Sequence, residues 1–177
     1  MKKIVFVIFC LLTISYFNPS IVLSQPTNKP PDRMKMLAAF NGEWKGEMVT
    51  IVNKKKIKYK LTHTSLKIAG GWGVQLNEVA MIPSKGKYQA ARIFSNSETG
   101  DTTYMYTIDT DGGTWFYKGV WETNKKLLLK ASNMKDGKKV EKTISYIFLS
   151  PKEYDYKSIT QMEGKEDEIV EMKMARQ

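Results

Sequence analysis

From residue 43 to its end, the sequence alternates runs of strand-forming residues with short segments of turn-forming residues. The turns, such as Asp111-Gly112-Gly113 and Lys135-Asp136-Gly137, contain residues that accept the backbone angles of hairpins. Because every link is short, each expected strand pairs antiparallel with the next one in the sequence. The expected strands cover 43–52, 56–68, 72–82, 87–95, 102–109, 114–123, 126–133, 139–149, 153–162 and 167–176.

This order of about ten short strands predicts an all-β fold, an up-and-down antiparallel barrel preceded by a short helix. A sandwich is the other usual solution for such strands, but its connections usually cross between two sheets. A barrel of about eight to ten strands has an interior that side chains fill or that holds a small ligand. The interior is therefore the first place where we expect a functional site.

One expected strand shows how its two faces differ. Ile57, Tyr59, Leu61 and His63 share one face, whereas the opposite face carries three lysines and a threonine. A lysine-rich outer face suits water, and lipid would penalise it. The pattern therefore indicates a barrel that is not integral to a membrane.

Residues 1–24 have the pattern of a signal peptide. Lys2 and Lys3 precede an almost unbroken apolar run over 4–17, which has the length of a signal-peptide core and is short for a membrane span. The segment Val22-Leu23-Ser24 suits a signal peptidase, and we expect cleavage before Gln25. The protein is therefore expected outside the cytoplasm, either periplasmic or secreted.

The chain after this cleavage point is expected to form a tether and one domain. Residues 25–31 carry three prolines, which is typical of an extended tether. Asp32 is expected to cap a short helix that runs through Phe40. The barrel domain is expected to span 32–177.

Charge and composition exclude several classes of function. The formal net charge is +10, and many of the lysines lie in expected turns such as Lys54-Lys55-Lys56, where they favour solubility; binding to an acidic surface is the other interpretation. Nucleic-acid sites favour arginine, which is scarce here, so we expect no nucleic-acid partner. One histidine and one cysteine exclude a disulfide scaffold and zinc centres. We therefore expect no metal and no cofactor.

Three polar residues fall within apolar patterns that are expected to point inward: His63, Glu78 and Arg92. Glu78 and Arg92 lie on successive strands, so they are placed to pair inside the barrel and to orient the polar group of a ligand. His63 is either a hydrogen-bonded interior residue or a ligand contact. A register shift of one residue would instead turn Glu78 and Arg92 outward.

Aromatic residues are frequent in the second half of the sequence, and Tyr104, Tyr106 and Tyr117 are candidates for a binding site. At inward-facing positions they would line a cavity for an apolar or ring-bearing ligand. Aromatic residues also pack against each other across neighbouring strands. The sequence leaves both interpretations open.

The segment Gly42-Glu43-Trp44-Lys45-Gly46 follows the expected helix, and Arg176 ends the last expected strand. This pair of features resembles the Gly-x-Trp opening of lipocalin and calycin barrels, where an arginine from the end of the barrel stacks over the tryptophan. The resemblance implies that Gly42, Trp44 and Arg176 close one end of the barrel. A guanidinium group and an indole ring stack well, which gives this arrangement a physical basis.

The segment Ile68-Ala69-Gly70-Gly71-Trp72 extends the resemblance to a bacterial calycin-like family of uncharacterised exported domains, over residues 36–177. A related family, the nitrobindins, shares the Gly-x-Trp-x-Gly start and binds haem through a histidine near the C-terminus. This sequence has no histidine after His63, so that axial ligand is missing, and haem could bind only through His63.

These features favour an exported soluble barrel that binds a small apolar or amphiphilic molecule in its interior. One alternative is a partner-binding barrel with a filled core and no ligand. Another is an enzyme on the same barrel that uses His63, Glu78 or Arg92, although no pair of catalytic residues is evident. The sequence does not indicate an oligomeric state.

Overall fold

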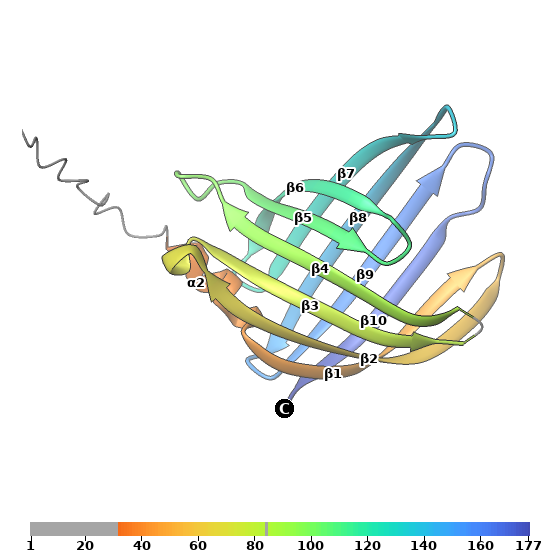
Figure 1. Ribbon diagram of the computed structural model, residues 1–177. Coiled ribbons are helices and arrows are strands. Elements are labelled where there is room, and N and C mark those ends of the chain that lie inside the picture. The colour runs from red at the N-terminus through yellow and green to blue at the C-terminus, as the bar shows by residue number, and fades with distance from the viewer. Residues whose placement is uncertain (1–31, 84) are drawn as a thin grey trace, which may run out of the picture.

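The computed structural model describes residues 32–83 and 85–177, so the expected signal peptide (1–24) and tether (25–31) lie outside the described residues. Ten antiparallel strands pair in sequence order, and β10 pairs with β1 to close the barrel (Figure 1). The expected fold class is therefore confirmed. The strands are β1 (Gly42–Val52), β2 (Lys55–Ile68), β3 (Gly73–Ile82), β4 (Gly86–Asn96), β5 (Thr103–Asp109), β6 (Thr114–Thr123), β7 (Lys126–Lys135), β8 (Lys138–Ser150), β9 (Glu153–Met162) and β10 (Glu168–Arg176).

Closure joins the first and last strands over most of their length. The pairing runs from Trp44 opposite Arg176 to Ile51 opposite Ile169. Eight consecutive residue pairs bring together segments that lie more than 100 residues apart in the sequence. A closed barrel has no free edge strand, so no row of backbone donors and acceptors is left unpaired along its sides.

A short helical segment precedes the barrel, as expected, but Asp32 does not cap it. Helix α2 (Met34–Leu37) continues as the 3₁₀ turn η1 (Ala38–Phe40), and the residue at the N-cap position is Arg33, without a side-chain capping bond. The carboxylate of Asp32 instead accepts a hydrogen bond from Lys35 Nζ at 2.7 Å. The lysine one turn away competes for the oxygen that a cap would use.

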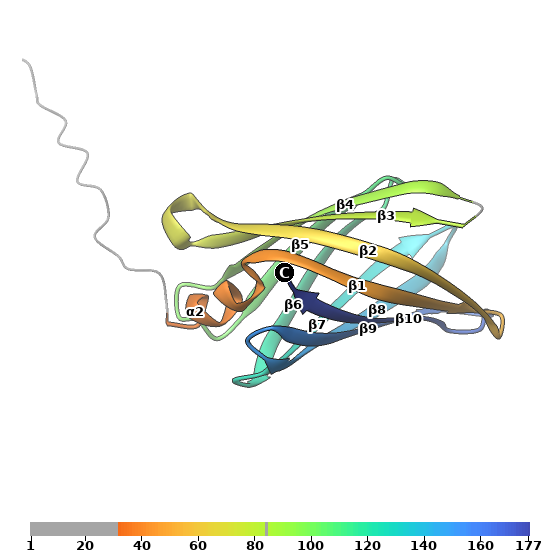
Figure 2. The same ribbon diagram turned by 90° about the horizontal axis from the view of Figure 1, so that it is seen from below.

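The helical segment seals one end of the barrel. Leu37, Phe40 and Trp44 are fully buried. The ring of Phe40 stacks on Phe94 at 5.1 Å and meets three further aromatic rings edge-on, with centroids 4.9 to 5.8 Å away. Seen from below, α2 lies against this end (Figure 2). We call it the closed end.

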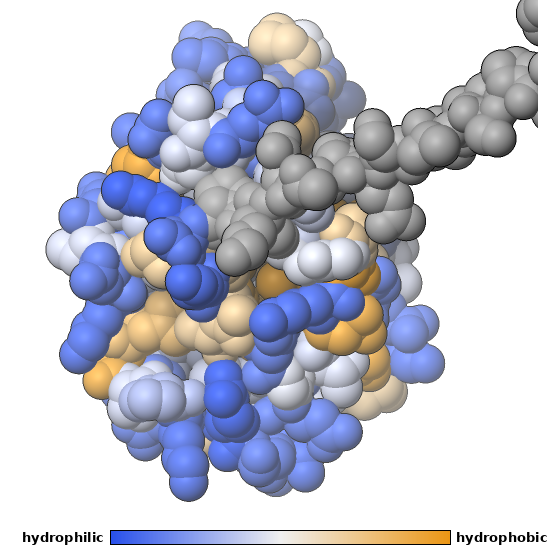
Figure 3. Space-filling view, turned by 90° about the vertical axis from the view of Figure 1, so that its left-hand side faces the viewer, coloured by the Kyte–Doolittle hydropathy of each residue, from blue (hydrophilic) through white to orange (hydrophobic). Residues whose placement is uncertain are grey.

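The opposite end, which we call the open end, carries the β1–β2, β3–β4, β5–β6, β7–β8 and β9–β10 turns (Figure 1). Inward-facing residues near these turns, such as Tyr59, Tyr88 and Trp115, are only half-buried. Solvent therefore reaches these side chains at the open end. At the closed end, the surface shows apolar residues grouped between hydrophilic ones (Figure 3). Among the described residues, no helix has the length and apolarity that crossing a membrane requires.

Candidate functional site

The residues expected to close the barrel do lie together at the closed end. The guanidinium carbon of Arg176 is 4.7 Å from the centre of the Trp44 ring. Arg176 also donates a hydrogen bond to the carbonyl of Ala39 at 2.6 Å, and the indole N–H of Trp44 donates to the carbonyl of Phe40 at 2.8 Å. Stacking and hydrogen bonding together tie the last strand to the helical segment.

The structure explains why glycine occupies both positions of the Gly-x-Trp-x-Gly segment, Gly42 and Gly46. Gly42 has a φ of +111°, a conformation that other residues rarely adopt. At Gly46, an added Cβ would collide with the carbonyl oxygen of Lys173 on β10 and with the sulfur of Met174. β1 therefore approaches β10 so closely that only a residue without a side chain fits.

Glu78 and Arg92 form a buried ion pair in the middle of the barrel. The pleats of β3 and β4 turn both side chains inward, and Arg92 Nη2 lies 2.8 Å from Glu78 Oε2. The residues are 2% and 6% exposed. Arg92 Nη1 also donates a hydrogen bond to the hydroxyl of Tyr146 on β8 at 2.9 Å, which links opposite walls of the barrel.

The surroundings keep Arg92 charged. Burial alone would lower the pKa of Arg92, but the Glu78 carboxylate and nearby tyrosine hydroxyls outweigh it, so the pKa lies well above its ordinary value. The guanidinium also lies over the ring of Tyr156, 5.3 Å from the ring centre. A buried charge with a partner, a hydroxyl and an aromatic face is satisfied on several sides.

Two polar atoms beside this ion pair have no hydrogen-bond partner in the described chain: Arg92 Nε and Thr107 Oγ1. Arg92 and Thr107 lie opposite each other on β4 and β5, and each is 6% exposed. Buried polar atoms are usually satisfied, by water if not by protein. Both atoms are therefore candidates to hold a water or a ligand oxygen.

His63 lies in the interior, between the closed end and the ion pair. It pairs with Trp44 on β1 and with Glu78 on β3, and its Nδ1 is 3.0 Å from the hydroxyl of Tyr154. Burial, and to a smaller extent the charge of Arg92, lowers the pKa of His63 to about 3. His63 is therefore neutral at ordinary pH, and its Nε2 has no partner among the described residues.

Half-buried aromatic residues surround the interior above the ion pair. Trp115 and Tyr88 face inward near the open end, and the Lys142 ammonium lies 4.1 Å from the centre of the Trp115 ring. Burial lowers the pKa of Lys142 and raises the pKa of Tyr88 and of Tyr117. We call this upper part of the interior the cup, with walls formed by Tyr59, Tyr88, Trp115, Tyr117, Lys142 and Tyr156.

The candidate tyrosines separate into two groups. Tyr117 is 3% exposed and faces the cup. Tyr104 and Tyr106 do not line the interior, because the inward residues of β5 are Thr103, Met105 and Thr107. The pleat turns both tyrosines to the outer wall, where Tyr104 stacks on Phe116 at 5.8 Å. Their expected place in an interior site is therefore wrong.

Sequence reasoning missed Thr107 and Lys142. Lys142 alternates with Val140 and Ile144 on β8, so the inward pattern contained a signal for it. Thr107 is a common strand residue, and only its pairing with Arg92 reveals its place. The position of a partner on the neighbouring strand cannot be read from one strand alone.

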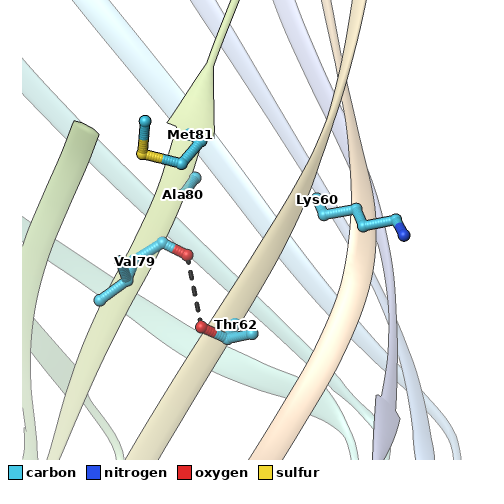
Figure 4. Close-up of a pocket in the computed structure, with 5 residues that line it drawn as sticks. All are labelled: Lys60, Thr62, Val79, Ala80 and Met81. Atoms are coloured by element: carbon cyan, nitrogen blue, oxygen red, sulfur yellow. Dashed lines mark hydrogen bonds between the residues drawn. The ribbon is translucent and has the colours of Figure 1, made fainter. Parts of the chain in front are cut away.

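Two hollows lie on the outside of the barrel. One, of about 440 Å³, lies between β2 and β3 and is lined by Lys60, Thr62, Val79, Ala80 and Met81 (Figure 4). The other, of about 310 Å³, lies along β8, β9 and β10. In the part of the chain that the structure describes, no group of three or more His, Cys, Asp and Glu residues is placed to hold a metal ion.

The barrel is similar to solved structures of lipocalin-like barrels. Rv2717c from M. tuberculosis is 14% identical, with a TM-score of 0.66 over 84% of this chain and 99% of that one. The S-type phycobiliprotein lyase CPES from Guillardia theta is 6% identical, with a TM-score of 0.58 over 81% of this chain and 91% of that one.

No family model matches the sequence, and no curated protein matches it at a significant level. The structural likeness therefore shows a closed lipocalin-like barrel and leaves the function to be argued from the site.

Proposed function

We propose that this protein is exported and binds a small amphiphilic molecule in the cup, with the polar group of the molecule toward Arg92 and Glu78. The observation that carries the proposal is the position of this ion pair. It lies deeper in the barrel than the half-buried aromatic side chains of Tyr59, Tyr88 and Trp115 near the open end. Binding sites typically combine apolar walls with a few convergent polar groups.

Arg92 also has a nitrogen that a ligand could contact, its Nε. Glu78 and two of the Arg92 nitrogens are engaged with each other and with Tyr146, which holds the guanidinium in place. Among the residues that the structure describes, Arg92 Nε has no partner, and neither does the hydroxyl of Thr107, which pairs with Arg92 across β4 and β5. An acceptor oxygen, such as that of a carboxylate or carbonyl, would satisfy either group.

The test compares ligand binding by two double variants. Replacing both Glu78 and Arg92 (Glu78→Leu with Arg92→Met) removes the pair without leaving one buried charge unpaired. The control, Lys157→Met with Glu171→Leu, removes an exposed pair of similar geometry on the outer wall. Dansyl-undecanoate is the probe, because it joins an acceptor head group to an apolar chain.

We expect the interior double variant to bind dansyl-undecanoate at least tenfold more weakly than the unaltered protein, with the control unchanged. Equal binding by all three proteins, or no binding by any of them, would refute the proposal. Export is tested separately, by the intact mass of the protein recovered from outside the cytoplasm, which we expect to begin at Gln25.

A second candidate function, partner binding by a barrel with a filled core, has its own support. The closed half of the interior is packed with aromatic rings, and both hollows described above lie on the outer wall. A protein of this kind would bind no amphiphile in the test above.

A further inference from the structure

One sector of the outer wall is almost without charge. Outward-facing residues of β1, β2 and β8 to β10 include many lysines and carboxylates, for example Glu47, Lys58 and Lys173. The outward-facing residues of β3, β4 and β5, and those of β6 up to Phe116, include a single charged residue, Lys87, which lies near the β3–β4 turn. We call this sector the uncharged wall.

The uncharged wall is apolar across three neighbouring strands. Ile93 on β4 pairs with Tyr106 on β5, and Tyr106 pairs with Phe116 on β6. These three side chains are 44%, 40% and 53% exposed, and Ile108 beside them is 50% exposed. Because directly paired residues touch on the same face of a sheet, they form one continuous surface.

The size of this surface is sufficient for a specific contact. Each strand residue occupies about 4.8 Å by 3.3 Å of a sheet, so the residues of β3, β4 and β5 and those of β6 up to Phe116 cover about 500 Å². Two such walls in contact would bury about 1,000 Å², which is the smallest area expected of a biological interface and suits a weak dimer. The largest apolar patch on a monomeric protein is often functional.

We propose that the uncharged wall is a dimer interface, at which two copies of this chain pack face to face. The formal net charge of the chain is +10, so most other pairs of walls would bring lysines of two copies together. Interface centres are depleted of charge and enriched in aromatic residues and methionine, which describes this wall. A two-fold contact uses the same patch on both copies, so a self-complementary apolar wall suffices.

The edge of the wall adds a feature that suits a second copy. Val79 and Met81, which are 37% and 65% exposed, line the hollow of about 440 Å³ together with Lys60 (Figure 4). A hollow at one edge of the wall and exposed rings such as Phe116 at the other edge provide both shapes that a self-complementary contact requires. The wall lies on the side of the barrel, so pairing leaves the open end free.

The test measures the mass of the purified protein by sedimentation equilibrium over concentrations from about 1 μM to 1 mM, a range that covers weak to moderate dimers. We expect a reversible monomer–dimer equilibrium. Phe116→Lys should raise the dissociation constant at least tenfold. The matched control is Leu149→Lys on β8, because Leu149 is also 53% exposed and lies outside the wall; it should leave the constant unchanged.

Two further measurements keep the outcome decisive. Ile108→Lys repeats the test at a second position of the wall, in case Phe116→Lys impairs folding, which circular dichroism would reveal. A protein that stays monomeric throughout, or one whose dimer Leu149→Lys weakens as much as Phe116→Lys, would overturn the proposal. So would a monomer whose wall binds vesicles of anionic lipid. None of these results bears on amphiphile binding in the cup.

Discussion

Arg176, the penultimate residue, lies over the ring of Trp44 in the first strand and holds the two ends of the barrel sequence together. The same guanidinium donates a hydrogen bond to the carbonyl of Ala39, so it also fixes the helical segment that seals the closed end. One side chain therefore joins three parts of the fold. Replacing Arg176 should therefore lower stability more than replacing other residues near the end of β10.

We expect Arg176→Ala to lower the free energy of unfolding by about 2 to 3 kcal/mol, because it removes a cation–π contact and a hydrogen bond to a charged donor. Arg176→Lys should recover only part of this loss, since an ammonium does not stack as a plane. Urea denaturation measures the free energy of unfolding of both variants. Lys173→Ala, at an exposed position of the same strand, is the control, and an equal loss there would contradict this role for Arg176.

Gly46→Ala tests the close approach of β1 and β10. The added methyl group would collide with the backbone carbonyl of Lys173, which cannot move aside without disturbing the strand pairing. We expect a loss of about 2 kcal/mol or more, by the strain that overpacking produces. At Gly112, where an added Cβ meets nothing, the same substitution would act only through the positive φ and should cost about 1 kcal/mol. Thermal unfolding of both variants would compare them, and equal losses would refute the close approach.

The Glu78–Arg92 pair should show strong coupling between its partners. Arg92→Met alone leaves a buried carboxylate without its partner and should cost about 3 to 5 kcal/mol, as should Glu78→Leu alone. The double variant should be much closer to the unaltered protein, because no unpaired charge remains. A double-mutant cycle measures this coupling. Additive losses would show that the two groups do not interact in the folded protein.

His63 should make the protein less stable as the pH falls. The folded protein holds the pKa of His63 at about 3, whereas the unfolded chain has the ordinary value near 6.5. Below about pH 6.5 the unfolded state therefore binds a proton that the folded state rejects, and stability is lost. For this one group the loss between pH 7.5 and pH 5 should be about 2 kcal/mol.

The pH dependence of His63→Gln provides the comparison, because glutamine does not titrate. Urea denaturation of this variant should give nearly the same stability at pH 7.5 and pH 5, apart from contributions of carboxylates at the acidic end. His63 is the only histidine of the chain, so no second imidazole obscures the comparison. If His63→Gln loses as much stability between pH 7.5 and pH 5 as the unaltered protein does, His63 is not buried as a neutral group.

The order and limits of the strands were predictable because the turns carry strong local signals. Gly86, Gly112 and Gly137 all have positive φ, as their turns require, and they separate the strands where the sequence indicates. The inward direction of Glu78 and Arg92 also followed from alternation with apolar neighbours. Both properties depend on residues close together in the sequence.

Other features depend on contacts between distant strands. The hydrogen bond from Arg92 to Tyr146 joins residues 54 positions apart, and no local pattern encodes it. β5 misled the sequence interpretation because its outward face, with Tyr104, Tyr106 and Ile108, is more apolar than its inward face, which carries Thr103, Met105 and Thr107. The structure decides between these positions through the register of β4, β5 and β6.

Native mass spectrometry of the protein recovered from outside the cytoplasm is the most direct test for an amphiphile bound in the cup. We expect a reproducible excess mass over the chain that begins at Gln25, lost on denaturation and matching a small amphiphile, and we expect the Glu78→Leu, Arg92→Met double variant to lose it. If the native protein has only the mass of its chain, and dansyl-undecanoate adds nothing to it, the claim is contradicted and the barrel has a filled core.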